Sequence, residues 1–158
     1  MCSGFYIGGN MSDLEYMKIA YQEALKAYEK DEVPIGAIIV KDDQIIARSY
    51  NLKENKQMVT RHAEINVIEE AERMLGNWYL DECTLYTTLE PCLMCSGAII
   101  QSRIKRVVFG ASDTRWASLT KVIRNEKVNH HPDIYENIYM EECSTLLKKY
   151  FKEKRKQK

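Results

Sequence analysis

The alternation of strand-like and helix-like segments is the feature that most constrains the fold of this chain. Four segments are expected to be strands: 33–40, 44–50, 83–89 and 106–110. The first is an apolar, β-branched run typical of a buried strand, and the second returns from it as a hairpin after a turn at Asp42-Asp43. Three segments have a helical spacing of apolar residues: 12–30, 60–75 and 91–102. Because strand–helix–strand units place helices over a sheet through right-handed crossovers, this order predicts an α/β fold, a three-layer α/β/α sandwich on a mixed central sheet of about five strands.

Local signals mark where the expected helices begin. Ser12-Asp13-Leu14-Glu15 has the capping-box pattern, and Thr60 is placed to cap the second helix. Pro91 suits the first turn of the third helix, because its missing N–H is not needed there. The polar segment 51–60 is expected to form a loop.

The C-terminal third gives weaker signals. Residues 113–128 fit no single element, and 134–140 is expected to add a fifth strand. A last helix is expected from Glu141 to about Lys156, with five side chains facing inward: Cys143, Leu146, Leu147, Tyr150 and Phe151.

Composition indicates a single globular domain over residues 1–158, with 1–11 as an N-terminal extension. No apolar run approaches the roughly 20 residues of a membrane span. Residues 1–10 lack the charged and apolar regions of a secretory signal, so a cytoplasmic location is expected. Five cysteines are a poor disulfide framework, and Cys2, Cys83 and Cys143 are expected to be reduced thiols.

Charge is balanced over the whole chain but concentrated at its C-terminal end. Lys+Arg and Asp+Glu number 23 each, so the net charge says little about nucleic acid. The basic end of the last helix, 148–158, carries seven lysine or arginine residues against one acid, Glu153. This segment is a candidate phosphate contact, and a solvated, fraying helix end is the alternative.

Two short motifs, His62-Ala63-Glu64 and Pro91-Cys92-Leu93-Met94-Cys95, carry the candidate chemistry. Each stands where a helix is expected to begin, and the spacing of Cys92 and Cys95 places both sulfurs on one helix face. The partial positive charge of a helix N-terminus favours thiolates. Two thiolates and the His62 imidazole make three ligands for one Zn²⁺, and the fourth tetrahedral position is left for water, as in catalytic zinc sites.

Glu64 is the candidate catalytic residue. It lies two residues from His62 on the first turn of the same expected helix, near the water without being a ligand. Deamination of a ring requires a proton on a ring nitrogen and a protonated leaving amine, and one carboxylate can supply both. A zinc ribbon needs a second Cys-x-x-Cys, which the sequence lacks, and a thioredoxin-like redox pair has no use for His62 and Glu64.

The combined pattern has the His-x-Glu and Pro-Cys-x-x-Cys signature of zinc-dependent nucleobase deaminases. From about Leu14 to Phe151 the chain resembles the cytidine deaminase-like superfamily, and within it the tRNA-specific adenosine deaminases. The segments that carry the resemblance are 33–37, 51, 62–65, 85–92, 94–95, 102–104, 107–111, 113, 129–130 and 142–143.

This resemblance implies a homodimer with one Zn²⁺ per chain that converts the wobble adenosine in a tRNA anticodon loop to inosine. Asn51 and the backbone of Ala63 match positions that contact the base, and Asp113 and Arg115 match a loop that lines the substrate cleft. The last helix, with Phe151 and its basic end, matches the element that approaches the anticodon loop. From the residues alone, Asn51 is also consistent with a turn residue that ends a strand.

The chain departs from the family pattern near the expected substrate mouth rather than near the zinc ligands. Arg61 stands where bacterial members usually have a small residue, and the loop after Asp113 is shorter and lacks the usual Gly-Ala-rich stretch. Trp116 in this loop is either a core side chain or a stacking platform for a base. Two other functions stay open: deamination of a free nucleobase or nucleoside, such as guanine or cytosine, and a non-enzymatic zinc-stabilised module.

Overall fold

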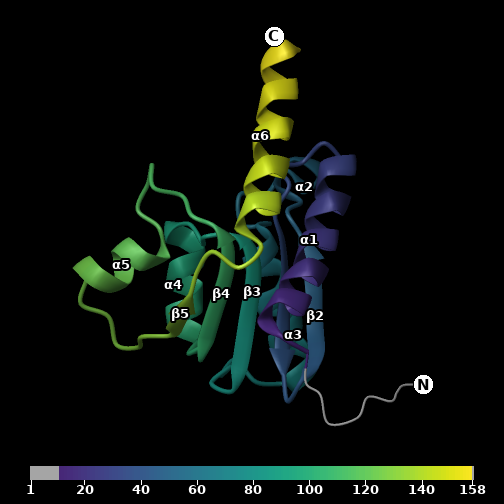
Figure 1. Ribbon diagram of the computed structural model, residues 1–158. Coiled ribbons are helices and arrows are strands. Elements are labelled where there is room, and N and C mark those ends of the chain that lie inside the picture. The colour runs from purple at the N-terminus through teal and green to yellow at the C-terminus, as the bar shows by residue number, and fades with distance from the viewer. Residues whose placement is uncertain (1–10, 158) are drawn as a thin grey trace.

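The computed structural model describes residues 11–157, and in this range one mixed sheet of five strands lies between two layers of helices (Figure 1). The elements are α1 (Asp13–Glu29), β1 (Gly36–Lys41), β2 (Gln44–Tyr50), α2 (Lys53–Lys56), α3 (Ala63–Leu75), β3 (Cys83–Leu89), α4 (Leu93–Ser102), β4 (Arg106–Ala111), α5 (Leu119–Asn125), β5 (Asp133–Tyr135) and α6 (Met140–Lys156). In the strand order β2-β1-β3-β4-β5, β1 is antiparallel to β2 and β3, whereas β3, β4 and β5 are parallel. The expected three-layer α/β/α architecture is confirmed.

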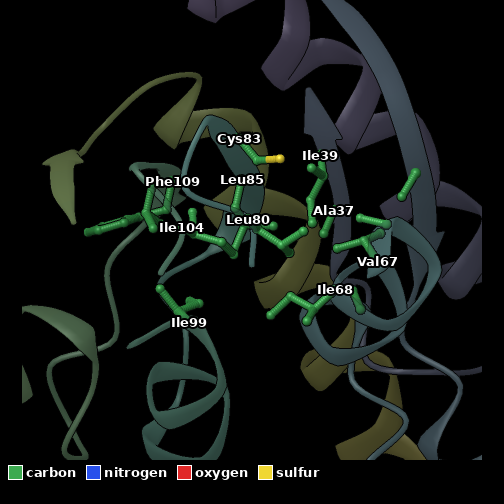
Figure 2. Close-up of a cluster of buried hydrophobic side chains, with 14 of the residues drawn as sticks. Ala37, Ile39, Val67, Ile68, Leu80, Cys83, Leu85, Ile99, Ile104 and Phe109 are labelled. Carbon is green, nitrogen blue, oxygen red and sulfur yellow. The ribbon is translucent and has the colours of Figure 1, made fainter. Parts of the chain in front are cut away.

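Two hydrophobic clusters fill the space on the two faces of the sheet. On one face, Val67 and Ile68 of α3 and Ile99 of α4 pack against residues of β1, β3 and β4 (Figure 2). On the other face, Met17 of α1 and Cys143 of α6 pack against the same strands. Because helices cover both faces, β1 is a continuous apolar run rather than an alternating one.

The first residue of β1 lies directly against α1. A Cβ atom at Gly36 would lie 2.2 Å from the carbonyl oxygen of Ala20 and 2.4 Å from the backbone nitrogen of Ala24. The contact therefore requires glycine, because no side chain fits between the two backbones. The Gly36 N–H also donates to Oγ1 of Thr88 at 3.1 Å, which ties this end of β1 to β3.

Two helices begin later than local capping rules predict. The capping box at Ser12 is present in α1. However, the N-cap of α3 is His62 rather than Thr60, and the N-cap of α4 is Cys92, so that Pro91 lies outside the helix. Neither of these N-cap side chains forms a capping hydrogen bond, and Nδ1 of His62 lies 3.6 Å from the Cys92 sulfur.

The segment 51–60, expected as a loop, contains the short helix α2. Glu32 is fully buried and accepts hydrogen bonds from the backbone N–H groups of Glu54 and Asn55 at 3.0 and 2.6 Å. Glu32 thus supplies the N-terminal hydrogen bonds of α2 from a turn more than 20 residues earlier in the chain. Local sequence patterns around 51–60 contain no sign of this contact.

The C-terminal part differs most from the expectation. α5 occupies part of the segment 113–128, and β5 is limited to three residues rather than extending to Met140. The strand stops because Asn137 and Tyr139 have φ angles of 67° and 63°, which turn the chain into α6. Phe151 was expected inside, but its side chain is 39% exposed.

The remaining cysteines behave as expected where the structure describes them. Cys83 and Cys143 are buried and free, and burial raises their pKa values to about 11 and about 12, which keeps both as thiols. Cys2, Lys158 and the N-terminal extension up to Asn10 lie outside the described residues. Within residues 11–157, no helix combines the length and hydrophobicity needed to cross a membrane.

Candidate active site

Two helix N-termini meet at one end of the sheet. Because β1 is antiparallel to both β2 and β3, these two strands run in the same direction, and the helices α3 and α4 that follow them begin at the same end. His62 precedes α3, Cys92 precedes α4, and Cys95 lies in the first turn of α4. Nδ1 of His62 lies 3.6 Å from each of the two sulfurs, so the structure brings together the three ligands predicted from the sequence.

The trio His62, Cys92 and Cys95 is a potential metal-binding group. One ligand atom from each residue lies within 4.8 Å of the other two. Sulfur and imidazole nitrogen suit a borderline-soft divalent cation. Among residues 11–157 the group has three members, and three protein ligands would leave a coordination position open, unlike a closed structural site.

The three side chains perturb one another electrostatically. Hydrogen bonding from Cys95, assisted by His62, lowers the pKa of Cys92 to about 4. Donation to Cys92, together with burial, raises the pKa of Cys95, and the hydrogen bond to Cys92 raises the pKa of His62. The trio therefore holds protons that a bound cation would displace.

Glu64 lies in the first turn of α3 and is only 3% exposed. Burial raises the pKa of Glu64 to about 7. Its Oε1 atom is buried and has no hydrogen-bond partner among the described residues. A buried polar atom without a partner indicates a place for water or a ligand, and a group that titrates near neutral pH is suited to accept and to donate a proton.

The two predicted base contacts differ in what the structure assigns to them. Asn51 is buried, and its amide bonds to the backbone in two directions: Nδ2 donates to the Val33 carbonyl at 3.2 Å, and Oδ1 accepts from the Lys53 N–H at 3.1 Å. Asn51 thus has the role of a turn residue, although its amide has one more N–H than these bonds use. Ala63 is the buried first residue of α3, where backbone N–H groups have no acceptor within the helix.

Asp113 and Arg115 are paired with each other in the loop after β4. Nε of Arg115 lies 3.2 Å from Oδ1 of Asp113, and this contact lowers the pKa of Asp113. Lys121 donates to the carbonyl groups of Thr114 and Trp116 at 2.8 and 3.4 Å, which fixes the loop from the side of α5. Trp116 is 68% exposed, so the core alternative for this side chain is wrong.

A cleft of about 630 Å³ lies between this loop and α6. Both Asp113 and Arg115 line it, as do Val33 and Leu89. α6 contributes Ser144, Leu147, Lys148, Phe151, Lys154 and Arg155. The cleft therefore combines an apolar lining with basic side chains, and the exposed face of Phe151 opens into it.

The basic end of α6 is only partly available to the cleft. Lys148, Lys154 and Arg155 line it, whereas Lys152 and Lys156 are exposed elsewhere on the helix. Nζ of Lys154 lies 2.6 Å from Oδ2 of Asp31, which anchors the helix to the turn after α1. In Figure 1 the C-terminal turns of α6 extend beyond the sheet.

One buried residue of the site was missed by the sequence reasoning, although it lies inside a motif. Glu90 is 4% exposed and stands between β3 and Pro91. The trio does not line the cleft, and Glu90 connects the two because its carboxylate accepts hydrogen bonds from the loop that carries Asp113. The signal was a charged residue between a buried strand and a proline.

Comparison with known proteins places this arrangement in a family. A family model described as MafB19-like deaminase matches residues 11–155. The chain belongs to this deaminase family. The tRNA-specific adenosine deaminase of Bacillus subtilis (strain 168) is 47% identical to this deaminase over 146 residues, which are 90% of this chain and 91% of the relative.

Two solved structures are similar to this deaminase. One, from work on A-to-I editing by tRNA:A34 deaminases at the wobble position of transfer RNA, has a TM-score of 0.80 at 41% identity and covers 84% of this chain and 98% of that chain. The other, guanine deaminase from Bacillus subtilis, has a TM-score of 0.63 at 40% identity and covers 66% of this chain and 67% of that chain. The resemblance inferred from the motifs is confirmed, and the non-enzymatic module is set aside in favour of a hydrolytic deaminase.

Replacing Cys92 or Cys95 with serine is expected to remove bound metal, because a serine hydroxyl does not supply an anionic sulfur ligand. In elemental analysis of the purified deaminase, the metal content should fall from about one ion per chain to nearly none. Cys83→Ser is the matched control, since Cys83 is a buried thiol in β3 outside the trio. Full metal content in both site variants would show that the metal binds elsewhere.

Proposed function

We propose that this deaminase is a zinc-dependent enzyme that converts adenosine to inosine at the wobble position of a tRNA anticodon. The observation that carries the chemistry is the buried Glu64 carboxyl group, with its unpaired oxygen, on the same helix start as His62. The observation that supports a nucleic-acid substrate is the cleft between the Asp113 loop and the basic face of α6. The B. subtilis relative named for this activity is 47% identical over nearly the whole chain.

The donor set of the trio fits zinc. Cys92, Cys95 and His62 supply two sulfurs and one imidazole nitrogen, a combination typical of catalytic zinc sites with three protein ligands. When bound, zinc supplies Lewis acidity that lowers the pKa of water from about 15.7 to about 7. The low pKa of Cys92 supports this assignment, because a thiolate is the form that binds a metal.

Glu64 is proposed to move the protons of the reaction. Hydrolytic deamination of adenosine forms a bond between water oxygen and C6 of the base, breaks the bond between C6 and the amino nitrogen, and releases ammonia. In this scheme Glu64 accepts a proton from the attacking water and delivers it to N1 of the ring. It then accepts the second proton from the new C6 hydroxyl group and transfers it to the departing amine, which leaves as ammonia while a C6 carbonyl forms. A pKa raised to about 7 by burial suits both directions of transfer.

The substrate contacts proposed for the remaining residues follow from where they lie. The Ala63 N–H and the spare N–H of Asn51 are donors that can meet the edge of a flipped base. Asp113 and Arg115 line the cleft on one side, and Lys148 and Arg155 can meet phosphates on the other.

The assembly and location are further parts of the proposal. We assign residues 1–158 to a single deaminase domain and place it in the cytoplasm, where tRNA is modified. A homodimer is supported by exposed apolar side chains on the helical face opposite α1: Leu93 of α4 is 61% exposed, and Trp78 before β3 is 59% exposed. Two hollows lined by these residues adjoin at Gln101, which gives one continuous surface for a second copy.

Deamination of a free purine is the second candidate function. The likeness to guanine deaminase at 40% identity favours it. It predicts turnover of small substrates without salt-sensitive RNA binding. The basic side chains that line the cleft, Lys148, Lys154 and Arg155, favour the RNA substrate instead.

A substrate panel tests the proposed function. The zinc-loaded deaminase is incubated with adenosine-containing anticodon stem-loops and with the same sequences fully paired to a complementary strand. Free adenosine, guanine, cytosine and cytidine complete the panel. We expect ammonia release and inosine only with the stem-loops, because an unpaired loop base is displaced at low cost. Turnover of guanine with inert stem-loops would establish the second candidate in place of the first.

Glu64→Gln is expected to retain zinc and to lose activity by about 10²- to 10⁴-fold, because the glutamine amide cannot accept and donate the proton. Activity is measured as inosine formation, and zinc by elemental analysis of the same sample. Glu70→Gln is the control, since Glu70 lies on the same helix but is exposed. Loss of zinc together with activity would assign Glu64 to metal binding instead.

Neutralising the cleft side of α6 is expected to weaken RNA binding and flatten its salt dependence. For the double variant Lys148→Gln with Arg155→Gln, the slope of log affinity against log salt should fall by about 0.7 to 1 per lost phosphate contact. The control is Lys41→Gln with Lys105→Gln, because these lysines lie at the opposite end of the sheet, next to the starts of β3 and β4. Equal slopes in the wild type and in both double variants would show that the basic end of α6 is solvated and does not contact phosphates.

A further inference from the structure

Glu90 is a buried acidic residue that belongs neither to the trio nor to the two hydrophobic clusters. It follows β3, and its own N–H donates to the Ala111 carbonyl at the end of β4 at 2.8 Å. Its side chain is 4% exposed. A buried carboxylate is costly unless hydrogen bonds compensate for the lost water, so its partners identify what it holds.

The partners of Glu90 lie at both ends of the loop that lines the cleft. Oε1 accepts from the Asp113 N–H at 3.3 Å, at the start of the loop. Oε2 accepts from the backbone N–H of Thr120 at 2.9 Å and from its hydroxyl at 2.6 Å, where the loop passes into α5. The Glu90 carboxylate therefore joins the two ends of the segment 113–120 through hydrogen bonds.

The same loop rests on the segment that carries the metal ligands. The Leu119 N–H donates to the Pro91 carbonyl at 3.1 Å, and Ser118 forms an isolated antiparallel bridge with Cys92. Within the loop, Oγ of Ser118 donates to the Asp113 carbonyl at 3.0 Å. The loop is thus fastened to the two residues that immediately follow Glu90.

We propose that Glu90 is a positioning residue that fixes the loop 113–118 relative to Cys92, and thereby sets where a base in the cleft lies with respect to the trio. The identity of that base rests on the proposed function, whereas the fixing of the loop does not. Glu90 touches no reacting atom in this assignment and acts through Asp113 and Arg115, which line the cleft.

Glutamine is the informative substitution at position 90. It preserves the size and shape of the side chain but replaces one acceptor oxygen with an NH₂ group. That group would face either the Asp113 N–H or the Thr120 N–H, so at least one backbone donor in the loop loses its acceptor. The loop should then become mobile while the sheet and the trio keep their structure.

Trp116 provides a direct readout of the loop. The chain has two tryptophans, Trp78 and Trp116, so Trp78→Phe leaves a single reporter at the exposed tip of the loop. In this background, Glu90→Gln should lower the fluorescence anisotropy of Trp116 and raise its quenching by acrylamide. With anticodon stem-loops, KM should rise about tenfold with a smaller change in kcat, and zinc content should stay unchanged.

Glu23→Gln in the same background is the matched control. Glu23 is 2% exposed and accepts hydrogen bonds from Lys26 and Arg48 at 2.8 Å each, on the side of the sheet covered by α1. It should lower the melting temperature without changing Trp116 anisotropy or KM. If Glu90→Gln fails to fold, Thr120→Val, which removes only the hydroxyl donor, should shift the anisotropy in the same direction by a smaller amount.

Three outcomes would overturn the proposal: wild-type Trp116 anisotropy in Glu90→Gln, the same anisotropy change in Glu23→Gln, or loss of zinc in Glu90→Gln. The last would mean that Glu90 holds Cys92 rather than the loop. If the anisotropy changes as expected but no protein deaminates RNA, the positioning role stands and the proposed substrate fails. The two proposals can therefore fail separately.

Discussion

The common direction of β2, β3 and β4 is the constraint on which the rest of the structure depends. β1 is antiparallel to β2 and β3, and β4 is parallel to β3, so three strands end at the same edge of the sheet. The segments that leave these ends carry His62, Cys92 and the loop with Asp113. His62 and Cys92, which are 30 positions apart, lie next to each other because the strands that precede them end at the same edge of the sheet. Sites at the carboxyl ends of strands are common in α/β proteins.

Local sequence patterns predicted the sheet better than the helix starts. β2 and β3 have the expected bounds: β2 begins directly after the turn at Asp42-Asp43, and β3 is a largely buried strand between α3 and α4 in the chain. The starts of α3 and α4 were misplaced because His62 and Cys92 occupy the N-cap positions without capping their helices. At these two positions the requirements of the site override the preferences of the backbone.

The remaining differences come from long-range contacts that no local pattern reveals. The Glu32 carboxylate accepts hydrogen bonds from the first turn of α2, and the Glu90 carboxylate joins the two ends of the loop after β4. Phe151 was expected in the core from helical spacing, but the end of α6 passes beyond the sheet, so that the ring lines a cleft instead. The grouping of the trio was predictable because metal ligands leave a short-range signature, whereas the commitment of Asn51 to two backbone groups became visible only in three dimensions.

The contact between Gly36 and α1 has a consequence for how this chain can vary. The distance between that helix and the sheet is set where two main chains touch, with no side chain between them. Substitutions on the outer surface of α1 therefore have no means of shifting its depth on the sheet. The outer face of the helix can diverge widely in amino-acid identity while the end of β1 beneath it, and the residues aligned with that end, keep their positions.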